Sequence, residues 1–124
     1  MDKEARLGPE MVLNHTIFFT MIGDEDFFSA VPAFSTIKDA AQEIHRKITD
    51  AIVNKDRSCL SCSDIQTSVK PVFVAFVSLV RKFALEDPEA LEPLIQYITR
   101  RRGYRPAPIR LYFKAQGKVG TLEL

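Results

Sequence analysis

The stretch VFVAFVSLV, residues Val72–Val80, is the most apolar part of the chain and restricts its fold most. It is far shorter than the roughly 20 apolar residues that cross a bilayer, and Arg81 and Lys82 follow it directly. We therefore expect it in a protein core and not in a membrane. Because the segment stays apolar on nearly every side as far as Glu86, it predicts a central buried helix with Pro71 in its first turn. The valine and phenylalanine content leaves a buried strand as the alternative.

An amphipathic helix is predicted before this segment. Ser35 or Thr36 can cap it, and Asn54 is a suitable stop. Its other face is charged and polar, so we expect a surface helix with one side on the core. The apolar positions recur at the spacing of one helix face and are Ile37, Ala40, Ala41, Ile44, Ile48, Ala51 and Ile52.

The N-terminal third predicts a strand and an irregular connection. Residues 11–22 alternate between apolar and mixed positions and contain phenylalanine, isoleucine and threonine, which favours a half-buried strand. Asp24, Glu25 and Asp26 then form an acidic turn. We expect no regular element from there to Pro32.

The C-terminal third predicts a short turn at 88–92, a helix at 93–102 and a closing hairpin. Pro93 breaks the apolar stripe and should separate the turn from the helix. Gly103 fits the left-handed position that ends many helices. Residues 109–114 and 119–124 flank a glycine-containing turn and read as two strands.

These elements predict a single α+β domain over residues 1–124, of ordinary soluble composition. It has an N-terminal strand, three helices with the apolar one central, and a C-terminal β-hairpin that pairs with the first strand. We expect residues 1–9 to be a flexible N-terminal segment and 55–68 a polar loop. Because the start of the chain makes a poor secretory signal, we expect a cytoplasmic protein.

The polar loop carries both cysteines of the chain, Cys59 and Cys62, separated by two residues. Such a pair can hold one tetrahedral zinc ion, which needs four ligands. His15 and His45 are the only histidines and would complete the set if the first strand and first helix converge on the loop. A dimer with one cysteine pair from each chain is a second route to four ligands.

Two other interpretations of these residues stay open. The cysteines can be small buried side chains, with His15 in the core and His45 at the edge of a helix. They can also form a redox pair, although such pairs usually follow a strand and this one follows a predicted helix.

Charge is unevenly distributed. Residues 1–95 contain ten Lys or Arg and fifteen Asp or Glu, whereas residues 96–124 contain seven and one. An acidic protein surface or a nucleic acid would be attracted to the basic end, where tyrosines can also stack on bases. The candidate contact residues are Arg100, Arg101, Arg102, Tyr104, Arg105, Arg110, Tyr112, Lys114 and Lys118. The alternative is that these arginines pair with acids of the same chain, for example in the turn at 24–26.

The sequence favours binding over catalysis. It contains neither a phosphate-binding glycine loop nor a nucleophile elbow. We therefore expect a small, non-enzymatic interaction or regulatory protein that engages an acidic partner surface through its arginine-rich C-terminal part. A zinc-containing nucleic-acid binder is the alternative, followed by a thiol- or metal-dependent enzyme built on Cys59. Exposed strand edges also predict self-association into a homodimer.

Overall fold

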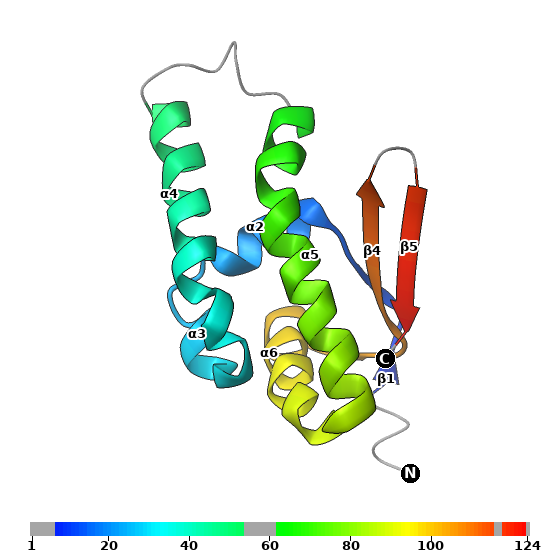
Figure 1. Ribbon diagram of the computed structural model, residues 1–124. Helices are drawn as coiled ribbons and strands as arrows, with labels where there is room; N and C mark the ends of the chain where they lie inside the picture. The colour runs from blue at the N-terminus through cyan, green and yellow to red at the C-terminus, as the bar shows by residue number, and fades with distance from the viewer. Residues whose placement is uncertain (1–6, 54–61, 116–117, 124) are drawn as a thin grey trace.

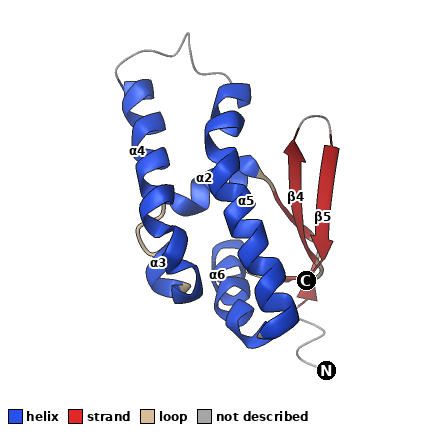
Figure 2. Cartoon of the chain, in the orientation of Figure 1, coloured by secondary structure: helices blue, strands red, loops and turns tan. Residues whose placement is uncertain are grey.

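A computed structural model of the protein describes residues 7–53, 62–115 and 118–123. Helices make up most of this part of the chain, and the strands lie together at one side (Figures 1 and 2). Its α-helices are α2 (His15–Ile22), α3 (Phe27–Ala30), α4 (Lys38–Val53), α5 (Cys62–Glu86) and α6 (Glu92–Arg102). The 3₁₀ helices η1 (Pro32–Ile37) and η3 (Pro88–Leu91) lead into α4 and α6.

The strands are short and join the two ends of the described chain. Strand β4 is the middle of a three-stranded sheet, parallel to β2 and antiparallel to β5. In this sheet Leu13 lies opposite Leu111, and both are buried. A separate parallel pair joins β1 to β3. The bounds are β1 (Leu7–Gly8), β2 (Met11–Leu13), β3 (Arg105–Pro106), β4 (Ile109–Ala115) and β5 (Lys118–Glu123).

The α+β class predicted from the sequence is wrong, because the described chain is mainly helical with little sheet. The largest error is at residues 11–22, where strand β2 covers only Met11–Leu13 and helix α2 follows. The side chain of Asn14 accepts a hydrogen bond of 2.9 Å from the Ile17 backbone N–H and so caps α2. The segment after Gly23, expected to be irregular, also contains a helix, α3.

The helices predicted at the other positions are present. Helix α4 covers the expected amphipathic segment, and η3 and α6 match the predicted turn and helix within one residue. The apolar segment at 72–80 is helical and not a strand. Its helix, α5, begins at Cys62, so that Pro71 lies inside the helix and the polar loop expected at 55–68 is helical from residue 62 onward.

Helix α5 supplies the centre of the core and lies between α4 and the β4–β5 strands (Figure 1). Its Phe73 and Phe76 are fully buried. The Phe76 ring lies 4.9 Å from both Phe18 of α2 and Phe34 of η1, measured between ring centroids. Aromatic contacts therefore tie two elements, α2 and η1, to α5. No helix of the described residues is long and apolar enough to cross a membrane.

Candidate functional site: a pocket edged by arginines

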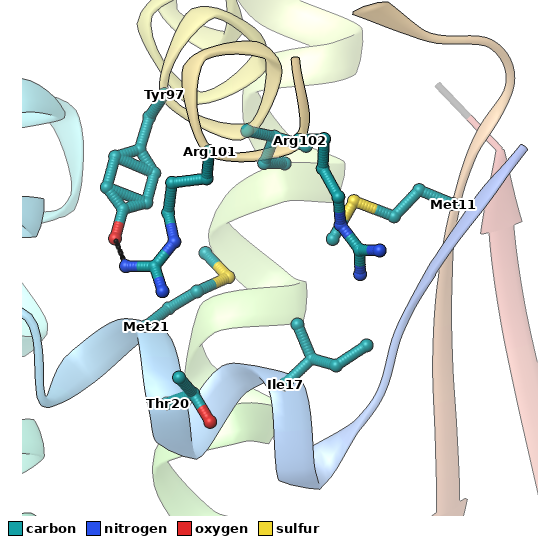
Figure 3. Close-up of a pocket in the computed structure, with 8 residues that line it drawn as sticks. Met11, Ile17, Thr20, Met21, Tyr97, Arg101 and Arg102 are labelled. Carbon is teal, nitrogen blue, oxygen red and sulfur yellow. Dashed lines mark hydrogen bonds between the residues drawn. The ribbon is translucent and has the colours of Figure 1, made fainter. Parts of the chain in front are cut away.

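A pocket of about 330 Å³ opens between α2, α6 and β2. Figure 3 shows Arg101 and Arg102 extending from α6 into the space above α2. Helix α2 contributes Ile17, Thr20 and Met21, and strand β2 contributes Met11. Helix α6 contributes Tyr97, Ile98, Arg101 and Arg102.

Helix periodicity explains why these side chains meet. On α2 the lining residues are spaced by three and four positions, which places them on one helix face. On α6, Arg101 lies four positions after Tyr97, and Arg102 lies four positions after Ile98. Residues four positions apart share one helix face. The pocket is therefore the gap between two facing helix sides, closed at one end by β2.

The floor of the pocket is apolar. Met11, Met21 and Ile98 are 6%, 4% and 2% exposed, and they belong to the hydrophobic core. Methionine side chains are flexible and adapt to irregular apolar shapes. Arg101 and Arg102 lie exposed at the edge, and Arg102, which has no ion pair among the described residues, supplies positive charge there. An apolar floor with a cationic edge suits a ligand that carries both an apolar group and a negative charge.

Arg101 is held in place by two partners within the chain. Its Nη1 donates to Asp24 Oδ2 at 2.9 Å and to the Tyr97 hydroxyl at 3.0 Å. The Tyr97 hydroxyl donates to the same Asp24 oxygen at 2.6 Å. Because the Asp24 carboxylate offsets the charge of Arg101, this arginine adds little net charge to the pocket.

The hydrogen bonds of this triad shift its pKa values. The bond from Tyr97, followed by one from the backbone N–H of Asp26, lowers the pKa of Asp24. Burial, followed by the bond to Asp24, raises the pKa of Tyr97 to about 12. At neutral pH the tyrosine therefore keeps its proton and the aspartate is charged, which is the arrangement that the triad requires.

Two more of the predicted contact arginines form ion pairs within the chain. Arg105 binds Glu92 through two hydrogen bonds, of 2.8 and 3.2 Å. The hydrogen bond to Glu92 raises the pKa of Arg105. Arg110 lies 3.2 Å from Glu10. Together with Arg101 and Asp24, these pairs match the alternative in which arginines pair within the chain.

Arg100 and Arg102 differ from these three arginines. Both are exposed in the last turn of α6, and among the described residues no ion pair involves either of them. Positive charge at this helix end also interacts favourably with the helix dipole, which accounts for their position in the sequence. The side chain of Arg102 borders the pocket (Figure 3).

Of the other predicted contact residues, Tyr104 and Tyr112 do not line the pocket. Tyr104 is half-buried, and a Cβ atom at Gly8 would overlap its ring, so the ring lies directly on the β1 backbone. Tyr112 of β4 is 38% exposed. Lys114 and Lys118 belong to β4 and β5, but their side chains lie outside the described residues.

The two histidines predicted as zinc ligands lie at opposite ends of α2. His15 is 4% exposed, with its ring centroid 4.8 Å from that of Phe73. Burial, followed by the charge of Lys70, lowers the pKa of His15 and favours the neutral ring. His45 of α4 stacks on Phe19 with a centroid distance of 4.8 Å, beside the end of α2.

The cysteines are only partly covered by the structure. Cys59 lies outside the described residues, and Cys62 begins α5, but its side chain is not described. Within the described chain no three His, Cys, Asp or Glu side chains group as they would around a metal ion. The zinc site stays a prediction.

Of the eight residues that line the pocket, only Arg101 and Arg102 were predicted from the sequence as contact residues. The three on α2 were missed because residues 11–22 were interpreted as a strand. That interpretation placed Ile17 and Met21 on one sheet face and Thr20 on the other. The signals for a helix were present in Asn14, a preferred N-cap residue, and in Phe18, Met21 and Ile22, whose spacing of three and four marks one helix face.

Comparison of the chain with known protein families, curated proteins and solved structures gives no match.

Proposed function

We propose that the protein is a small, non-enzymatic interaction protein that binds an acidic partner surface through the exposed end of α6. One observation carries this proposal: Arg100 and Arg102 are exposed, while Arg101, Arg105 and Arg110 have acidic partners in the same chain. The guanidinium group matches the geometry of a carboxylate, because two N–H groups can bind its two oxygens together. On the sequence grounds given above, we infer a cytoplasmic location.

The rigid surroundings support a role in binding. The triad of Asp24, Tyr97 and Arg101 fixes the last turn of α6 against the turn after α2. Gly103 then ends the helix, with its backbone N–H bonded to the Thr99 carbonyl at 2.8 Å. A fixed helix end loses little conformational entropy when a partner binds, so that more of the attraction between charges appears as affinity.

A labelled decaglutamate peptide is the probe that tests this proposal. Its affinity should fall roughly tenfold in the double variant Arg100→Gln/Arg102→Gln, because two exposed charge pairs each contribute about 0.2–1 kcal/mol. Fluorescence anisotropy at two salt concentrations measures the affinity, and binding should weaken at the higher one.

The matched control is Arg81→Gln/Lys82→Gln, which removes the same charge from exposed positions on α5. It should leave the affinity within about twofold of the wild type. Equal losses in both double variants, or no binding by the wild type, would contradict the proposal. Tighter binding of a single-stranded oligonucleotide than of decaglutamate at equal charge would favour the nucleic-acid alternative.

A further inference from the structure

We propose that the pocket between α2, α6 and β2 binds a small aliphatic carboxylate, with the carboxylate on Arg102 and the alkyl chain on the methionine-lined floor. This site goes beyond the binding of an acidic partner surface. It shares Arg102 with that function but depends on the apolar floor, which a flat contact with an acidic surface does not use.

The charge at the pocket selects a single negative group. Arg101 already has Asp24 Oδ2 at 2.9 Å, so this pair contributes almost no net charge. Arg102 borders the same pocket without an ion pair among the described residues. One uncompensated guanidinium matches one carboxylate, to which it can donate two parallel hydrogen bonds.

The remaining polar atoms of the lining leave little for a polar ligand body to bind. The Tyr97 hydroxyl donates its proton to Asp24, and the Thr20 hydroxyl donates to the Thr16 carbonyl at 3.1 Å. The buried part of the lining, Met11, Met21 and Ile98, is apolar. A sugar or a nucleotide would replace only some of its hydrogen bonds to water there, whereas an alkyl chain gains from leaving water.

The size of the pocket limits the length of the alkyl chain. Its volume of about 330 Å³ is near the lower end of the range for small-molecule pockets. A chain of medium length can fill it, and the flexible methionines can adjust to the chain. Octanoate is therefore a suitable probe.

Titration with octanoate, followed by two-dimensional amide NMR of the full chain, tests the proposal. We expect saturable shifts of the amide signals of α2 and the last turn of α6. Butyrate should bind at least roughly tenfold more weakly, since each buried CH₂ contributes about 0.8 kcal/mol. Octanol, which has the alkyl chain without the charge, should also bind more weakly.

Arg102→Gln should weaken octanoate binding about tenfold, because it removes the charged donor. Arg81→Gln, which removes the same charge from α5, should leave the affinity unchanged. Both positions are exposed, so neither change should disturb folding, which circular dichroism checks. Octanoate shifts that do not saturate, or an equal loss in the two variants, would overturn the proposal. If decaglutamate still bound, only the carboxylate pocket would be refuted, and the proposed function would stand.

Discussion

Asp24 is the residue that separates Arg101 from its two neighbours in α6. Its carboxylate accepts hydrogen bonds from both Arg101 and Tyr97, so one acidic side chain fixes a cation and an aromatic ring at the edge of the pocket. The side chain is 27% exposed. Arg100 and Arg102 lie on either side in the sequence and extend to solvent. The division of roles among the three arginines therefore depends on a residue 77 positions away in the chain.

Asp24→Asn should lower the free energy of unfolding by about 1 kcal/mol near neutral pH, because it removes a charged acceptor. The pKa of Asp24 in the folded protein is lower than its ordinary value of 3.8. The stabilisation by its charge is thus complete above pH 3.8 and is lost as the pH falls through the folded pKa. Urea unfolding at several pH values should show the difference between wild type and variant shrinking below pH 3.8.

Asp26→Asn is the control for this experiment, since Asp26 is exposed and contacts Asp24 through its backbone N–H. It should change stability by less than about 0.5 kcal/mol. A difference between wild type and Asp24→Asn that stays constant at all pH values would show that the charge of Asp24 is not the stabilising feature.

At the scale of the element, local signals identified helix ends better than they identified the type of the N-terminal segment. Gly103, with φ of 80°, occupies the left-handed position expected from the sequence and ends α6. Residues 11–22 satisfied two patterns together, because their alternation resembles a strand while Asn14 and the spacing of Phe18 and Met21 indicate a helix. Packing of Phe18 on α5, which no local pattern shows, is consistent with the helix.

Gly103→Ala should lower the free energy of unfolding by about 1 kcal/mol through backbone strain. A Cβ atom at Gly103 would meet no other atom within 4 Å, so steric overlap adds nothing to this loss. Gly103→Asn should cost less, since asparagine tolerates the left-handed conformation. Urea unfolding measures both variants. Equal losses for alanine and asparagine would exclude backbone conformation as the cause.

At the scale of the whole molecule, the fold depends on contacts between distant parts of the chain. Strand β2, near the start of the described chain, pairs with β4, near its end. The pocket is lined by residues of β2, α2 and α6. The sequence predicted where α6 ends and that arginines occupy its last turn, because helix ends are determined by residues close together in the sequence. It could not predict the pocket, which arises only when two helix faces that are far apart in the sequence meet.

Because the described residues form a single core, the protein should unfold as one unit. Substitution of Phe76 tests this prediction. Phe76→Ala should lower the free energy of unfolding by about 3–5 kcal/mol, because the ring is fully buried against Phe18, Phe34 and Phe73. Val74→Ala, at a position 38% exposed on the same helix, should cost less than about 1 kcal/mol.

The readouts of this experiment are far-UV circular dichroism, which follows the helices, and tyrosine fluorescence. The chain has three tyrosines and no tryptophan. The fluorescence is therefore measured in a Tyr104→Phe/Tyr112→Phe background, in which Tyr97 at the pocket is the remaining tyrosine. In a two-state protein both signals change at the same urea concentration, and Phe76→Ala moves both midpoints equally. If this variant does not fold, Phe76→Leu, which should cost roughly 1.5 kcal/mol, replaces it. A shift of the circular dichroism midpoint alone would mean that the pocket is stable without the aromatic core, and that the protein does not unfold as one unit.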